Sequence, residues 1–304
     1  MNLPDRIVTD LDFQTCRPVS SGAEKWLYRP IQCLDFGFVY LVDYMGNDEA
    51  IVKAARVSYG RGTRKTTEDR GLIRYLRRHM HTTPSEMIEV KFHCKMPIFV
   101  ARQWIRHRTA NVNEYSGRYS EMSNEFYLPN PNVLRKQSRS NRQGRGEELT
   151  PEQKARVISL LKEDYDRGYG HYREFLGDEI DLARELARIG LSVANYTEWY
   201  WKIDLHNLFH FLALRLDSHA QYEIRVYGEA IAMIVKDAFP IAFEAFEDYT
   251  LFGMNLSRLE KEFIRENAWP ISESAVQSLI LQKFGNKRET EEFMVKLKEL
   301  RLVI

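Results

Sequence analysis

The residues with the clearest chemical potential lie in one short polar stretch of the chain. Arg102, Arg106, Arg108 and Arg118 fall within seventeen residues, and amides, hydroxyls and a carboxylate lie between them. A guanidinium group binds phosphate through two parallel hydrogen bonds and stays charged at any physiological pH. Ser116-Gly117 could add backbone amides, because glycine permits close approach of a ligand. The stretch therefore predicts a loop that holds a phosphorylated ligand, although composition alone fits a solvated basic hairpin equally well.

A second candidate group is the pair His206 and His210, four residues apart on one face of a predicted helix. Histidines with this spacing can bind a metal ion, and nearby acids would complete the site of a metal-dependent nucleotide hydrolase. No acidic residue follows His206 in the Glu-x-x-His manner, however. A packed or hydrogen-bonded pair is the commoner arrangement, so the hydrolase stays an alternative hypothesis.

Two other groups are better explained without catalysis. A nucleophilic serine needs a base that is held by a third group, and the sequence around Ser116 shows no such order. A binding role for Ser116 is therefore favoured. Trp199, Tyr200 and Trp201 are adjacent, so they alternate between the faces of a strand and indicate core or subunit packing before ligand stacking.

Composition limits the class of protein. The 304 residues include 44 basic and 43 acidic side chains, and 44% are hydrophobic, which is typical of a globular protein. The net charge of +1 counts against the further alternative of an RNA-binding protein that uses the basic stretch. The cysteines Cys16, Cys33 and Cys94 form no Cys-x-x-Cys pair, and no apolar run approaches the roughly 18 residues of a membrane helix. We therefore expect a cytoplasmic protein with no nucleic-acid partner and no membrane partner.

The elements that must position the polar stretch show clear periodicities. Residues 88–96 alternate apolar and polar side chains, which predicts a half-buried antiparallel strand ending at Pro97. A helix from Ile98 to about Arg106 would deliver Arg106-His107-Arg108 at its C-terminal end. The elements expected before it are a strand at 36–42, a helix from its cap Asp48 to about Ser58, a loop at 60–67 and a helix at about 67–79.

Helices dominate the second half of the chain. Thr150 caps a helix that reaches about Leu176, with Pro151 at its first position and Gln153 closing a capping box. The other expected elements are a loop at 111–120, a linker at 137–148, a helix at 180–189, a strand at 191–203, helices from 204 to 239 and two or three short charged helices at 257–304. Without a βαβα rhythm or a Gly-x-Gly-x-x-Gly after a strand, this order predicts an α+β single domain with an antiparallel sheet and long helices, not a Rossmann fold.

The polar stretch also matches a family signature. Arg106-His107-Arg108, then seven residues, then Ser116 resembles the motif of flavin-dependent thymidylate synthases. The flanking segments agree: His81 to Pro84, Pro97 to Trp104, and Leu214 to Gln221 resemble the family at matching spacing. The resemblance covers roughly residues 36–246.

The resemblance implies an activity and an assembly. Such enzymes are α+β homotetramers whose active sites are shared between subunits. They are methyltransferases that bind FAD and convert dUMP to dTMP. Methylenetetrahydrofolate supplies the carbon and leaves as tetrahydrofolate, and NADPH reduces the flavin.

The resemblance also carries roles onto matching positions. Arg215 would be the catalytic residue, because it would face the uracil ring and stabilise the N3-ionised form, which makes C5 more nucleophilic. The implied dUMP contacts are Gln103, Trp104, Ile105, Arg106, Glu114, Tyr115, Ser116, Gly117, Arg118, Arg188 and Arg215. The implied FAD contacts are Ser58, Thr83, Arg106, His107, Arg108, Glu114, Asp204, Leu205, His206 and His210, and no metal is implied.

The chain departs from the family pattern on the flavin side. Some members have Asn-x-Arg where this chain has Asp204-Leu205-His206, and Asn where it has His210. A histidine can still donate a hydrogen bond or stack on adenine. The folate site has no motif of its own, and His81 and Tyr119 are its candidate neighbours. The expected division is an N-terminal extension at 1–35, a catalytic domain at 36–250 and a helical C-terminal extension at 251–304, with no role predicted for either extension.

Overall fold

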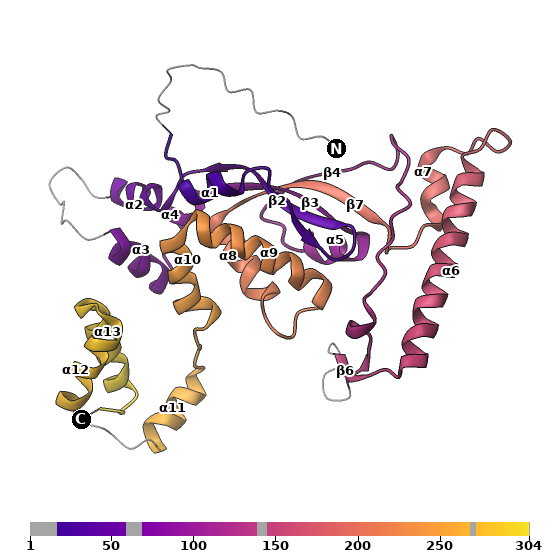
Figure 1. Cartoon of the computed structure of the whole chain (residues 1–304). Coiled ribbons are helices and arrows are strands. Elements are labelled where there is room, and N and C mark those ends of the chain that lie inside the picture. Colours follow the sequence, from indigo (N-terminus) through magenta and orange to yellow (C-terminus); the bar gives the residue numbers. More distant parts are fainter. Residues whose placement is uncertain (1–16, 59–68, 139–144, 268–271, 304) are drawn as a thin grey trace.

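The predicted strands pair into one antiparallel sheet. The structure, a computed structural model, describes residues 17–58, 69–138, 145–267 and 272–303. Within these residues the main sheet has five strands in the order β1-β2-β3-β7-β4, and every neighbouring pair is antiparallel (Figure 1). The strands are β1 (Ile31–Cys33), β2 (Gly37–Met45), β3 (Glu89–Pro97), β4 (Asn111–Glu114) and β7 (Tyr196–Asp204). The predicted α+β class with an antiparallel sheet is confirmed.

β3 is the central strand of the sheet and shows the alternation seen in the sequence. Val90, Phe92, Cys94 and Met96 are buried, whereas the residues between them are half-buried. β3 pairs with β2 on one side and with β7 on the other, so both of its edges are satisfied. The predicted half-buried strand is confirmed.

Helices cover one face of the sheet and form the core with it. These are α5 (Ile98–Trp104), α8 (Leu205–Arg215), α9 (Tyr222–Ala238) and α10 (Pro240–Phe246). Trp104 is fully buried, stacks on Phe211 at 5.0 Å between ring centroids, and meets Trp199 and Trp201 edge-on. Trp199 and Trp201 are buried while Tyr200 is 43% exposed, as alternation along a strand requires. Their predicted role in packing is confirmed.

Shorter helices flank this core. They are α1 (Ser21–Trp26), α2 (Asp48–Val57), α3 (Asp69–Arg78) and α4 (Thr83–Glu86). The helix expected from Asp48 forms, but the predicted cap is wrong, because Asn47 accepts the amide of Ala50. Asp48 instead accepts the amides of Ile241 and Ala242 at the start of α10. The segment assigned to an N-terminal extension contributes α1, which packs on α9, and β1, which joins the sheet.

The long helix α6 (Pro151–Phe175) begins with the predicted capping box, in which Thr150 and Gln153 bond reciprocally. The helix expected at 180–189 is shorter, because only α7 (Arg184–Ala187) and the 3-10 turn η2 (Arg188–Gly190) form. The strand expected from residue 191 begins only at Tyr196, where pairing with Pro97 starts.

Two segments expected to be irregular contain strands. The loop predicted at 111–120 begins with β4, and the linker predicted at 137–148 includes β6 (Arg145–Glu148), which pairs with β5 (Arg135–Gln137). The 3-10 turn η1 (Pro131–Val133) precedes β5. All four residues of β4 are exposed, so no apolar alternation marks the strand, and only backbone pairing with β7 defines it. The loop expected at 60–67 and residues 139–144 lie outside the described residues.

The C-terminal segment is helical, as predicted. The π-helical turn η3 (Glu247–Leu251) follows α10, and the described part of the tail then forms α11 (Arg258–Asn267), α12 (Glu273–Phe284) and α13 (Lys287–Glu299). Ile280, Met294 and Val303 form a small core of their own. Among the described helices, none is both long and apolar enough to cross a membrane.

Candidate functional site

The Arg106-His107-Arg108 motif lies in the turn between α5 and β4. Trp104, the last residue of α5, is fully buried, and the amide of His107 donates to its carbonyl at 3.0 Å. Arg106 and Arg108 are exposed, whereas His107 is half-buried. The turn thus presents two guanidinium groups from a rigid base. The predicted dUMP contact at Trp104 could involve only its backbone, because the indole ring belongs to the core.

His107 and Arg215 form a close pair. Arg215, the last residue of α8, donates from Nε at 3.2 Å and from Nη2 at 2.9 Å to Nε2 of His107. Burial, and then the charge of Arg215 and the proximity of His210, lower the pKa of His107 to about 4. His107 is therefore neutral at pH 7, and its ring proton must lie on Nδ1 for Nε2 to accept. Burial also lowers the pKa of Arg215, although a guanidinium remains charged.

A glycine lets the end of α8 approach α9. A Cβ placed on Gly228 would lie 3.2 Å from Cβ of Arg215, closer than side chains usually pack. The ring of His107 packs edge-on against Phe211, with centroids 4.9 Å apart. The backbone of Arg215 therefore packs closely on α9, and His107 holds its guanidinium group beside the motif.

A second group of predicted nucleotide contacts surrounds Gly117. A Cβ on Gly117 would lie 2.7 Å from Sδ of Met122 and 3.1 Å from Nη1 of Arg188, so the glycine allows Arg188 to cover it. Arg118 pairs through Nε with Glu185 at 2.9 Å. This arrangement brings two predicted phosphate-binding arginines next to one tight turn.

The turn itself suits Ser116 to binding. Its Oγ accepts the amide of Arg118 at 3.3 Å, and its carbonyl accepts the amides of Tyr119 and Ser120 at 3.1 Å each. The exposed Tyr115 donates its hydroxyl to the carbonyl of Glu121 at 2.6 Å.

Glu114 connects the two groups along β4. Its carboxylate accepts the hydroxyl of Thr197 at 2.8 Å, and the next amide, that of Tyr115, continues the pairing with β7. The arginines at the two ends nevertheless stay apart within one chain. Figure 1 shows α7, next to Arg188, beside α6 and away from α8, which ends at Arg215. One chain therefore supplies two separate halves of the predicted nucleotide site.

The start of α8 carries the other predicted flavin contacts. Asp204 caps the helix, since its carboxylate accepts the amide and the side chain of Asn207 at 2.9 and 2.7 Å. Leu205 is fully buried, so only its backbone could reach a ligand. His210 is exposed, and its ring lies 5.9 Å from that of His107. Asp204 therefore has a structural role as a helix cap, in addition to any contact with a ligand.

His206 has an unusual environment. Its Nδ1 is buried and finds no hydrogen-bond partner among the described residues, and burial, followed by the nearby charge of Arg77, lowers its pKa. The described part of the chain contains no group of three or more His, Cys, Asp or Glu side chains that could hold a metal ion. The hydrolase hypothesis therefore gains no support from His206 and His210.

The remaining predicted flavin contacts lie on neighbouring helices. Ser58 is the C-cap that follows α2, Thr83 begins α4, and α4 packs against both α2 and α8. The region thus combines exposed arginines of the motif with the orphaned Nδ1 of His206 and, near the motif, the orphaned Oε1 of Gln103. Exposed cations, and buried polar atoms that have no partner among the described residues, suit an anionic dinucleotide cofactor, so the residues present fit FAD.

Several residues that shape the site were not predicted from the sequence. They are Glu185 and Thr197, which contact predicted residues far away in the chain, and Met122 and Gly228, which lie close to Gly117 and Arg215. Gly228 alone gave a signal, because a glycine inside a strong helical pattern indicates close packing.

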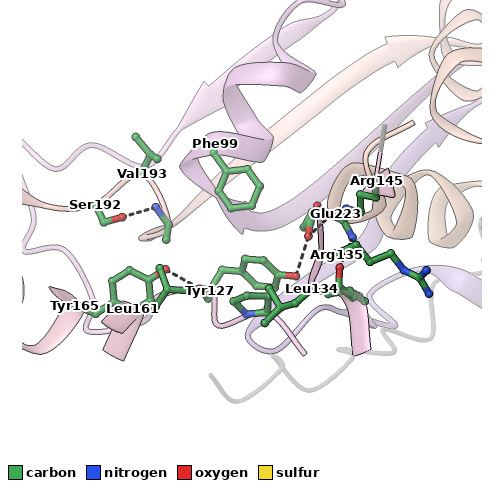
Figure 2. Close-up of a pocket in the computed structure, with 13 residues that line it drawn as sticks. Phe99, Tyr127, Leu134, Arg135, Arg145, Leu161, Tyr165, Ser192, Val193 and Glu223 are labelled. Atoms are coloured by element: carbon green, nitrogen blue, oxygen red, sulfur yellow. Dashed lines mark hydrogen bonds and ion pairs between the residues drawn. The ribbon is translucent and has the colours of Figure 1, made fainter. Parts of the chain in front are cut away.

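A cavity lies elsewhere in the described part of the chain. It measures about 380 Å³, and none of the predicted site residues lines it. Phe99, Tyr127 and Tyr165 form aromatic walls, and Figure 2 shows Glu223 and Arg145 together at one end. Glu223 already accepts from Arg145 at 2.6 and 2.7 Å and from Tyr127 at 3.1 Å. Because this polar end is satisfied internally, the cavity gives no indication of a ligand.

Comparison with known proteins places the chain in a family. The family model described as "Thymidylate synthase complementing protein" matches residues 40–241. A flavin-dependent thymidylate synthase of Ruegeria pomeroyi is 59% identical over 80% of this chain and 81% of its own length. One of Rickettsia prowazekii is 51% identical over 92% of this chain and 97% of its own.

Solved structures agree. The UMP/dUMP methylase PolB from Streptomyces cacaoi, bound with 5-Br UMP, matches with a TM-score of 0.65 and 33% identity, over 73% of this chain and 98% of that chain. The same methylase bound with 5-Br dUMP matches with a TM-score of 0.63. On the strength of its motif, its sheet and these relatives, the chain belongs to the flavin-dependent thymidylate synthase family.

Proposed function

We propose that this enzyme methylates dUMP to dTMP, taking the carbon from methylenetetrahydrofolate and the reducing equivalents from NADPH through FAD. The overall reaction consumes dUMP, methylenetetrahydrofolate, NADPH and a proton, and yields dTMP, tetrahydrofolate and NADP⁺. The observation that carries the proposal is the Arg215 guanidinium group, half-buried and fixed by His107 beside the Arg106-His107-Arg108 turn.

Arg215 is proposed as the catalytic residue. Its cation would face the uracil ring and stabilise the N3-ionised base, which makes C5 a better nucleophile. A fixed charge beside a developing anion in a water-poor site contributes about 3 kcal/mol, by analogy with oxyanion donors. The two hydrogen bonds to His107 hold the guanidinium group before the nucleotide arrives, so little reorganisation is needed.

The phosphate would be bound by the group around Gly117. Arg118 and Arg188 supply cations, and the turn at Ser116-Gly117 supplies amides. Arg118 is already paired with Glu185, but both side chains are largely exposed, so a phosphate can replace or share that partner. The dUMP contacts proposed for Gln103, Ile105, Arg106, Glu114 and Tyr115 complete this assignment.

The separation of the two groups supports a shared site. A nucleotide that contacts Arg215 at its base and Arg188 at its phosphate would need the second group from another copy of the chain. We therefore propose the homotetramer with active sites shared between subunits that the family resemblance implies. The cytoplasmic location stays a prediction.

FAD would be held by Ser58, Thr83, Arg106, His107, Arg108, Glu114, Asp204, Leu205, His206 and His210. When bound and reduced by NADPH, it would supply the hydride for the nucleotide. The chain's own contribution would be charge and position: Arg106 and Arg108 would offer cations to the pyrophosphate, and His206 a buried ring nitrogen that has no partner among the residues that the structure describes.

The test is an absorption spectrum of the purified enzyme, followed by turnover. We expect flavin absorbance, faster oxidation of NADPH when dUMP is present, and dTMP formed only when methylenetetrahydrofolate is added. A parallel reaction with UMP distinguishes a deoxynucleotide enzyme from one with the wider range named for PolB. A colourless protein that cannot be reconstituted with FAD would contradict the proposal.

A further inference from the structure

The C-terminal helix α13 is seated on α3 through buried charges. The side chain of Glu289 is 9% exposed, and it lies against Arg74, 11% exposed, and Arg78, 9% exposed. Arg74 donates to Glu289 at 3.2 Å, and the hydroxyl of Tyr249 donates to the same carboxylate. Buried charges are costly unless they are paired, so this contact has a defined geometry. Figure 1 shows α13 next to α3, and both Tyr249 and Glu289 lie beyond residue 241, where the family model ends.

A second set of contacts reaches the last turn of α3. Glu292 of α13 accepts from Arg78 and lies 3.1 Å from Nε2 of His79. Arg288 of α13 lies over the ring of Tyr75, 4.0 Å from its centroid. Tyr75 in turn contacts the ring of His79 at 4.3 Å and that of His81 at 5.8 Å.

The C-terminal end of α3 is joined to α4 through a short, hydrogen-bonded segment. Met80 has a φ of +59°, and its amide donates to the carbonyl of Arg77 at 3.2 Å. The amide of His81 donates to the carbonyl of Leu76 at 2.9 Å. These paired bonds around a left-handed residue form a closed helix C-terminal cap. Only Thr82 then separates His81 from Thr83, the first residue of α4, which packs on α8.

We propose that Arg288 and Glu292 are positioning residues, through which α13 holds the last turn of α3 and thereby fixes His81 and Thr83 at the flavin side of the site. This inference rests on the proposed function, in which Thr83 contacts FAD. It assigns a role to the C-terminal helices, for which the sequence alone predicted none. The segment from Arg74 to Thr83 thus contacts α10, η3 and α13 at its start, and α4 at its end packs on α8.

The test uses the full chain with Arg288→Gln or Glu292→Gln, and Lys298→Gln as the matched control. Lys298 also lies on α13, but it pairs with Glu273 inside the C-terminal segment. Hydrogen exchange of residues 79–83, measured without ligand, should become faster in the two variants and stay unchanged in the control. Arg288→Gln removes one exposed cation–π contact, so it should weaken FAD binding roughly two- to fivefold, measured by flavin fluorescence. Affinity for dUMP should stay the same, and Arg288→Lys should restore FAD binding.

The outcomes separate the inference from the proposed function. Unchanged hydrogen exchange in both variants would overturn the inference, and so would faster exchange with unchanged FAD affinity. In both cases the wild-type enzyme could still bind FAD and make dTMP, so the proposed function would stand. If the wild type bound no flavin at all, both ideas would fall, and the exchange data would still report whether α13 orders residues 79–83.

Discussion

The neutral state of His107 gives the enzyme a stability that depends on pH. Burial, and then the charge of Arg215, which donates two hydrogen bonds to the imidazole ring, lower the pKa of His107 from 6.5 to about 4 in the folded protein. The unfolded chain therefore takes up this proton near pH 6.5, and the folded protein only near pH 4. The stabilisation is complete above pH 6.5 and is lost as the pH falls from 6.5 to 4. The shift corresponds to about 3 kcal/mol for a fully shielded group, and partial exposure reduces this to about 1–2 kcal/mol.

The assay is urea unfolding at several pH values between 7 and 4.5, for the wild type and for His107→Gln. Glutamine places a carbonyl oxygen near the position of Nε2 but cannot take up a proton. We expect the wild type to lose about 1–2 kcal/mol more than the variant across this range. His206, whose pKa is also lowered by burial, titrates in both proteins and cancels in the difference. Parallel pH profiles for the two proteins would show that burial and Arg215 do not hold His107 neutral, and the reasoning would be refuted.

Three further predictions concern single side chains. Arg215→Ala should lose about two orders of magnitude in turnover while retaining its flavin spectrum, because about 3 kcal/mol of charge stabilisation is removed; full activity would refute the assigned role. Arg118→Ala should weaken dUMP more than FAD, which titration of each ligand would decide, and equal losses would contradict a phosphate contact. Glu289→Ala should lower the free energy of unfolding by about 2–3 kcal/mol, because Arg74 and Arg78 lose a buried partner. The exposed Glu291→Ala should change it by no more than about 0.5 kcal/mol, so similar urea midpoints for these two variants would rule out a stabilising role for Glu289.

Local patterns predicted those parts of the fold that local forces determine. The alternation along β3 and the capping box at Thr150 each depend on neighbours within a few residues, and both are confirmed. β4 was missed because its side chains are all exposed and its pairing with β7 involves backbone atoms about 90 residues away. Asn47 and Asp48 are both good caps, and the sequence could not rank them. In the structure Asn47 has the extended backbone of a cap and accepts the amide of Ala50.

In the site, too, residues within a motif could be found from the sequence, whereas contacts between distant segments could not. The motif singled out the loop that carries His107, and it made Ser116 and Arg118 candidates, whose roles stay predictions. Pattern alone could not show that Arg215 reaches His107 across 108 positions, or that Glu185 pairs with Arg118 across 67. Such contacts follow from tertiary packing, and they become visible only once the sheet and α8 are in place.

The burial of Trp104 has a consequence for how the enzyme fails on heating. Its indole ring is fully buried, and the turn that carries the Arg106-His107-Arg108 motif starts immediately after it. Because the turn follows a buried residue directly, we expect it to unfold together with the core and not before it. Cofactor release and the change in tryptophan emission should therefore occur at one temperature. Flavin fluorescence would then report global unfolding.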